Sequence, residues 1–291
     1  MSQYDELEGS RAPLIEHLSE LRNRLIICVA AFILAFIGCF ALSQQIYVFL
    51  LHPFQMAAAL LAEQKAGGGS HNALDLLEVM TGVKKAPPTG EALKLVFTAP
   101  LEFFFTKMKL AGFGAIVVTF PVLAFQLYRF VAPGLYKKER GAFLPFLLAA
   151  PVLFIAGASL VYYVMLPFVL WFSLSQQIIT ADVQVELLPK VSDYLALVTQ
   201  LLLAFGLCFQ LPVVLTLLGL AGIIESKTLA KGRRYAIVGI VAIAAVVTPP
   251  DPLSQIMLSV PIYMLYEISI WCVRIIELRR PKDESTELTT T

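Results

Sequence analysis

Charged side chains are scarce in this sequence. Only 15% of its 291 residues are Asp, Glu, Lys or Arg, whereas 58% are hydrophobic. A water-soluble domain carries about 25% charged residues, so this composition excludes a soluble globular enzyme. The charges also nearly cancel, with 22 basic and 21 acidic residues. We therefore expect no nucleic acid among the partners, because nucleic-acid binding requires clustered positive charge.

Residues that form disulfides, metal sites and catalytic centres are equally few. The four cysteines lie singly in apolar stretches, without CxxC pairs or cysteine–histidine spacings: Cys28, Cys39, Cys208 and Cys272. We interpret them as small buried hydrophobic side chains. The sequence also has no phosphate-binding loop, no HExxH and no Ser/His/Asp arrangement. We expect no metal, no cofactor and no enzymatic activity.

The sequence does contain long apolar segments. A helix needs about 20 mostly apolar residues to cross a bilayer. Six segments approach or exceed this length and predict the fold class, an all-α polytopic membrane protein with six transmembrane helices. The predicted spans are residues 25–42, 107–128, 143–172, 194–220, 235–247 and 253–273. The long segment 43–106 is predicted as a loop between the first two spans.

The fifth predicted span is short. Its apolar run, residues 236–247, covers only about 18 Å at 1.5 Å per residue, and the prolines of residues 248–252 stop it. A buried or re-entrant segment is the alternative. We interpret it as a short crossing because the flanking charges require an even number of crossings. The prolines then form a tight turn between the fifth and sixth helices.

The distribution of arginine predicts the orientation. All arginines, and 15 of the 22 basic residues, lie in four alternate segments: the N-terminus, the connections around residues 129–140 and 227–234, and the C-terminal tail. Lys and Arg concentrate on the cytoplasmic side of membrane proteins, so both termini are predicted to be cytoplasmic. Residues 1–24 are predicted to form an amphipathic helix, residues 43–106 an external loop, and residues 274–291 a disordered tail.

Two acidic residues lie near the predicted cytoplasmic ends of the spans. Glu20 could simply form an ion pair with Arg24 one helical turn later. Glu139 could simply neutralise its basic neighbours in the connection after the second span. If the two acids lie together, they form a receptor for an arginine-bearing peptide, because guanidinium binds carboxylate in a bidentate manner.

Other polar residues lie within the predicted spans. An acid at this depth costs about 2.5–3.5 kcal/mol to insert, so Glu267 is either functional or a buried structural hydrogen-bonding group. The glutamines at positions 126, 200 and 210 are typical of hydrogen bonds between helices.

An ion-coupled secondary transporter of a small solute is the alternative function. It would use Glu267 and Gln210 at mid-membrane, whereas a peptide receptor would use acids at the cytoplasmic edge.

Several short strings resemble the TatC family, the large subunit of the twin-arginine protein translocase. The resemblance covers residues 14–274. It rests on the HLSELR string at residues 17–22, the FVAPGLYKKER string at 130–140 and the TPPD string at 248–251. Further matches are SDY at 192–194, AFG at 204–206, LP at 211–212 and SQ at 254–255.

This resemblance implies a glove-shaped receptor in the bacterial inner membrane. Glu20 and Glu139 would bind the paired arginines of signal peptides on folded precursor proteins, with Arg22, Phe130 and Pro133 in support. Export would be driven by the proton-motive force, and the protein would work as a homo-oligomer within the receptor complex.

The same resemblance implies a second site, for the single-span subunits TatA and TatB, near the outer end of the fifth span at Val247 and Thr248. Asp251 and Glu267 are further polar candidates there. One position departs from the family, which commonly has a glutamate where this sequence has Gln210. We expect Gln210 to act as a polar contact and not as a proton-titrating group.

Overall fold

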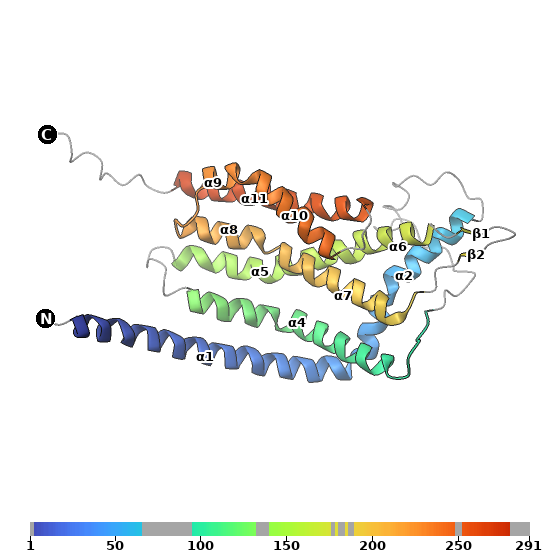
Figure 1. Cartoon of the computed structure of the whole chain (residues 1–291), viewed down its shortest axis with the longest axis horizontal. Helices are drawn as coiled ribbons and strands as arrows, with labels where there is room; N and C mark the ends of the chain where they lie inside the picture. The colour runs from blue at the N-terminus through green and yellow to red at the C-terminus, as the bar shows by residue number, and fades with distance from the viewer. Residues whose placement is uncertain are drawn as a thin grey trace. The chain divides into compact units, whose positions relative to one another are not determined.

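The computed structural model describes residues 3–65, 95–131, 140–175, 178–179, 184–185, 189–247 and 252–279 (Figure 1). This part of the chain is almost entirely helical. Its elements are α1 (Gln3–Ala41), α2 (Ser43–Lys65), α4 (Glu102–Val131), α5 (Arg140–Leu160), the π-helical turn η2 (Val161–Met165), α6 (Leu166–Ser175), β1 (Ile178–Ile179), β2 (Gln184–Val185), α7 (Val191–Cys208), α8 (Leu211–Leu220), α9 (Ser226–Lys231), α10 (Arg233–Val247) and α11 (Pro252–Arg279). The two strands are antiparallel neighbours.

Five stretches in the described part of the chain are long and apolar enough to cross a membrane: Leu18–Ala41, Glu102–Leu127, Leu148–Ser175, Val191–Leu220 and Gln255–Leu278. The predicted class, a helical multi-pass membrane protein, is confirmed. Helix α10 has 15 residues and covers about 22 Å, less than the hydrocarbon thickness of about 30 Å. The count of six crossings, the cytoplasmic termini and the glove shape therefore stay predictions.

The first predicted connection, residues 43–106, is not a simple loop. Its beginning forms helix α2, which was not predicted from the sequence. Buried side chains recur along α2 at helical spacing, at Ser43, Leu50, Phe54 and Ala58. Residues 66–94 of this connection lie outside the described part of the chain, as do most of the predicted C-terminal tail and the proline turn at 248–251.

The chain divides into two compact units. The first comprises Met1–Tyr136 and Ala158–Leu203, and the second Lys137–Gly157 and Ala204–Thr291. In the first unit, α1 packs along α4, and α2 packs against α6 and α4. In the second unit, α11 packs against α8, α9 and α10.

A proline inside α2 is accommodated by a tyrosine from far along the chain. Pro53 has no N–H, so the carbonyl of Phe49, four residues earlier, loses its helical partner. The Tyr162 hydroxyl donates to this carbonyl at 2.7 Å, and its ring stacks on Phe49 with 4.5 Å between centroids. The buried Tyr194 hydroxyl donates to the next carbonyl, that of Leu50, at 2.6 Å. These bonds stabilise a helix that proline would otherwise weaken.

In the second unit, two glycines let helices α5 and α7 approach closely. A Cβ atom on Gly157 would lie only 2.8 Å from the Phe205 carbonyl oxygen, and a Cβ on Gly206 only 2.6 Å from the ring of Phe154. Small residues at such contacts are typical of packing between transmembrane helices. The rings of Phe209 and Phe154 occupy the space beside Gly157 and Gly206, respectively.

Candidate functional site

Helices α1 and α4 provide the first candidate site, and their packing fixes which residues lie level with one another. They run in opposite directions in the first unit (Figure 1). A Cβ on Gly114 of α4 would lie 2.9 Å from Cys39 Sγ of α1, and one on Gly112 would lie 4.0 Å from Phe36. Both helices rise 1.5 Å per residue, so we count equal numbers of residues from these contacts, forward along α4 and backward along α1. Phe130 then lies level with about residues 18–23 of α1.

Glu20 and Arg22 fall within this range, so the structure brings Phe130 to their level. Arg22 is exposed and Phe130 is half-buried. The other two predicted residues of the site, Pro133 and Glu139, lie outside the described residues. The predicted pairing of Glu20 with Glu139 therefore stays a prediction.

Glu20 already accepts a guanidinium in the structure. Its Oε1 forms an ion pair with Nη2 of Arg24, one turn later on α1. The Glu20 side chain is 39% exposed and that of Arg24 only 13%. The local ion pair that the sequence suggested is thus present. Leu21 and Leu25 nearby are also exposed, so this part of α1 offers a carboxylate next to apolar surface, which suits a peptide with arginines and apolar side chains.

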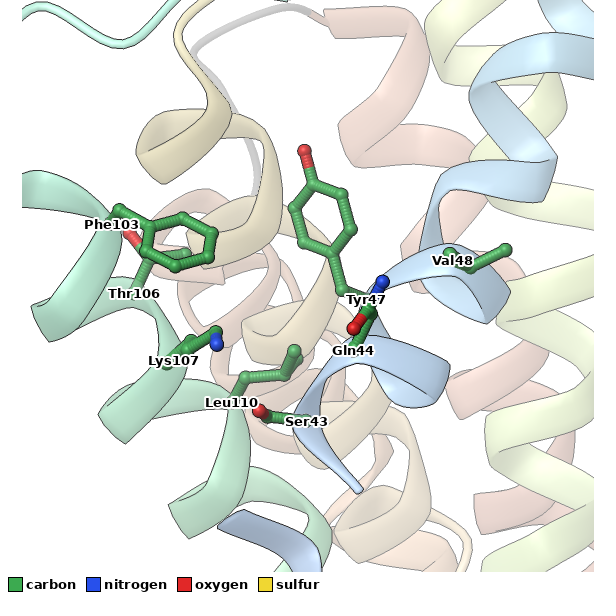
Figure 2. Close-up of a pocket in the computed structure, with 8 residues that line it drawn as sticks. All are labelled: Ser43, Gln44, Tyr47, Val48, Phe103, Thr106, Lys107 and Leu110. Atoms are coloured by element: carbon green, nitrogen blue, oxygen red, sulfur yellow. The ribbon is translucent and has the colours of Figure 1, made fainter. Parts of the chain in front are cut away.

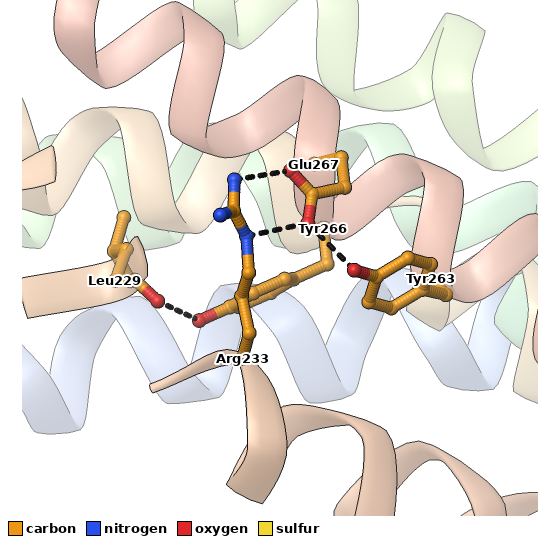
Figure 3. Close-up of polar contacts among 5 residues, drawn as sticks. All are labelled: Leu229, Arg233, Tyr263, Tyr266 and Glu267. Atoms are coloured by element: carbon orange, nitrogen blue, oxygen red, sulfur yellow. Dashed lines mark hydrogen bonds and ion pairs between the residues drawn. The ribbon is translucent and has the colours of Figure 1, made fainter. Parts of the chain in front are cut away.

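Glu267 of α11 has a very different environment (Figure 3). Its Oε1 accepts from Arg233 Nε at 2.7 Å and from the Tyr263 hydroxyl at 2.8 Å, while its Oε2 accepts from Arg233 Nη2 at 2.8 Å. Beside it, the Tyr266 hydroxyl donates to the Leu229 carbonyl at 2.8 Å. Of the two interpretations of Glu267, this geometry favours the structural hydrogen-bonding group. Arg233 was not predicted as its partner from the sequence, although an arginine just before an apolar run was a usable signal.

Gln210 lies in the turn between α7 and α8, where its Nε2 donates to the Ala150 carbonyl of α5 at 2.8 Å. Its amide therefore joins two helices of the second unit. Val247 is the last residue of α10 and is half-buried. Thr248 and Asp251 lie outside the described residues.

Comparison with known proteins decides the family. Residues 16–261 match the family of the Sec-independent protein translocase protein (TatC). The chain belongs to the TatC family. It is 41% identical over 277 residues to TatC of Magnetococcus marinus, covering 95% of this chain and 89% of that protein. It is 37% identical over 264 residues to TatCy of Bacillus subtilis, covering 91% and 89%.

A solved TatC structure supports the fold. The crystal structure described as the twin arginine translocase receptor TatC aligns with a TM-score of 0.68 and 30% sequence identity, covering 90% of this chain and 99% of that one. The resemblance drawn from the short sequence strings is therefore confirmed. This TatC-family chain is a multi-pass membrane protein and a component of a protein translocase.

Proposed function

We propose that this protein is the signal-peptide receptor and core subunit of the twin-arginine translocase in the bacterial inner membrane. Its task is to bind the paired arginines of folded precursors at the cytoplasmic surface, through Glu20 and Glu139, with Arg22, Phe130 and Pro133 in support. Family membership supports the receptor role. The observation that carries the site is Glu20, a partly exposed carboxylate that accepts a guanidinium and lies level with Phe130.

The chemistry of this site explains a preference for arginine. A carboxylate has two oxygens and about four acceptor positions, so Glu20 can accept a ligand guanidinium in addition to Arg24. Arginine donates in a planar fork that matches the carboxylate, whereas the lysine ammonium is a point charge. A peptide with two lysines therefore loses the bidentate geometry and binds more weakly.

Peptide binding tests this proposal. Synthetic signal peptides with Arg-Arg or Lys-Lys are titrated onto the purified protein in detergent, using the wild type, Glu20→Gln and Glu139→Gln. Glu16→Gln is the matched control, because it removes the same charge from the same helix about one turn earlier. The wild type and the control should bind the Arg-Arg peptide about tenfold more tightly than the Lys-Lys peptide, because charge-assisted hydrogen bonds contribute about 1.5–3 kcal/mol. Glu20→Gln and Glu139→Gln should lose this preference. Equal binding by Glu20→Gln and Glu16→Gln contradicts the proposed site.

We further propose that α10 binds the single transmembrane helix of TatA or TatB. Support comes from its exposed apolar surface: α10 buries Ile240 and Ala244, while Val238 and Val246 are 69% and 78% exposed. A photo-crosslinking residue at Val247 should capture a small Tat subunit in membranes, whereas the same residue at the buried position Ile240 should not. Equal capture from both positions, or from neither, contradicts this docking surface.

The transporter alternative gains no support from Glu267. A coupling acid must exchange protons or ions during the cycle, whereas Glu267 accepts three hydrogen bonds from Arg233 and Tyr263. Assembly as a homo-oligomer and coupling to the proton-motive force remain parts of the proposal that follow from the family.

A further inference from the structure

A cavity of about 300 Å³ lies in the first unit, between the beginnings of α2 and α4. We infer that it binds the phosphate group of a membrane phospholipid, with the Lys107 ammonium as its charged ligand. Figure 2 shows Lys107 on α4 pointing toward Ser43 and Gln44 of α2. The residues that line the cavity are Ser43, Gln44, Tyr47, Val48, Phe103, Thr106, Lys107 and Leu110.

The lining offers hydrogen-bond donors and one positive charge, without a carboxylate. Ser43 and Thr106 are buried polar residues, 4% and 6% exposed. Within the described part of the chain, their hydroxyls and the Lys107 ammonium make no hydrogen bond or ion pair with other residues. The contact found for Lys107 is with the ring of Phe103, 4.6 Å from its centroid. These hydroxyls can donate to a bound acceptor, and the ammonium charge favours an anion.

The cavity lies beside the ends of two candidate membrane spans. The candidate span Leu18–Ala41 ends just before Ser43, and Lys107 lies near the start of the candidate span Glu102–Leu127. The cavity thus marks the end of two spans on the same side of the bilayer. Lysines near span ends extend their ammonium groups toward the headgroup region, and that region supplies phosphate anions.

The surface next to the cavity suits acyl chains. Val48 and Phe103, which line the cavity, are 61% and 48% exposed, and the neighbouring Phe104 is 50% exposed. A free phosphate ion would satisfy the donors but would leave these apolar side chains uncovered. A phospholipid satisfies both, because its phosphate meets the donors while its chains cover the apolar surface. We therefore assign the site to a phospholipid and not to a soluble anion.

Native mass spectrometry of the purified protein tests this inference. Palmitoyl-oleoyl-phosphatidylglycerol is titrated onto the wild type, Lys107→Gln, Lys107→Arg and Lys109→Gln. Lys109 is the matched control, because it is exposed on the same helix and does not line the cavity. Loss of one charge-assisted contact should weaken lipid binding about tenfold in Lys107→Gln. Lys107→Arg, which keeps the charge, and Lys109→Gln should bind within about twofold of the wild type.

Two further ligands identify what the site recognises. Diacylglycerol with the same chains but no phosphate should bind no better to the wild type than to Lys107→Gln. Millimolar inorganic phosphate should not displace the lipid. A third variant, Thr106→Val, keeps the shape of the side chain and removes one donor, so it should weaken lipid binding severalfold even if Lys107→Gln proves unstable.

Three results would overturn the inference. Equal losses in Lys107→Gln and Lys109→Gln would mean that general surface charge attracts the lipid. Displacement by inorganic phosphate would mean a soluble-anion site. Unchanged lipid binding in both Lys107→Gln and Thr106→Val would mean that the cavity holds no phospholipid. None of these results depends on signal-peptide binding, so the lipid experiment and the peptide experiment test the two proposals independently.

Discussion

The packing of α5 on α7 makes a quantitative prediction for Gly157→Ala. The new Cβ would lie 2.8 Å from the Phe205 carbonyl oxygen and 2.7 Å from Phe209 Cγ. The carbonyl belongs to the backbone and cannot rotate away, so the helices must separate. Overpacking of this kind costs about 1–3 kcal/mol, and the better helix propensity of alanine returns about 0.5–1 kcal/mol. The difference lies between about 0 and 2.5 kcal/mol, and we expect a net loss of about 1 kcal/mol in the free energy of unfolding.

Gly38→Ala is the matched control for this prediction. Gly38 lies in α1 and has no atom within 4 Å of an added Cβ. Here only the helix propensity changes, so the same substitution should stabilise the protein by about 0.5–1 kcal/mol. Both variants are unfolded with sodium dodecyl sulfate in mixed micelles and followed by circular dichroism. A Gly157→Ala variant at least as stable as the wild type would refute the close contact between the two helices.

Two other substitutions test the polar contacts of the second unit in the same unfolding assay. Glu267→Gln should cost about 1.5–3 kcal/mol, because it removes the charge from a bidentate, charge-assisted contact with Arg233; stability equal to the wild type would mean that the pair contributes nothing. Gln210→Ala should cost about 0.6–1.7 kcal/mol, the usual range for a hydrogen bond between transmembrane helices, because it removes the bond to the Ala150 carbonyl. A neutral Gln210→Ala result would contradict that bond.

The sequence predicted the helical membrane fold well because the signal is local. A mostly apolar run of about 20 residues is by itself enough to indicate a membrane-spanning helix. Five such stretches are present in the structure. The distinctive TPPD and HLSELR strings likewise identified the family without structural information. These features need only neighbouring residues to be recognised.

Helix α2 was missed because its stability depends on residues far away in the chain. In the isolated segment, Pro53 predicts a break in any helix, because proline lacks the backbone N–H. The Tyr162 hydroxyl that satisfies the Phe49 carbonyl comes from 113 residues later. In hindsight, the helical spacing of Leu50, Phe54 and Ala58 was the available signal. The partner tyrosines could not be assigned from sequence, since nothing local distinguishes them from other aromatic residues in spans.

The candidate acids show the same division between local and distant information. One partner of Glu20, Arg24, lies four residues away and was named from the sequence. The partner of Glu267, Arg233, lies 34 residues away on another helix. For this reason the sequence left two interpretations of Glu267 open, and the structure was needed to favour one.

This difference in partners also bears on which acid suits reversible binding. Glu267 connects α11 to α10 through Arg233, so withdrawing its carboxylate disturbs the packing of two helices. The ion pair of Glu20 with Arg24 stays within α1. Exchanging such a pair for a ligand guanidinium costs about 0.3–0.5 kcal/mol. A charge-assisted bond to the ligand, about 1.5–3 kcal/mol, exceeds this cost, which makes Glu20 the better suited of the two to capture and release an arginine-bearing peptide.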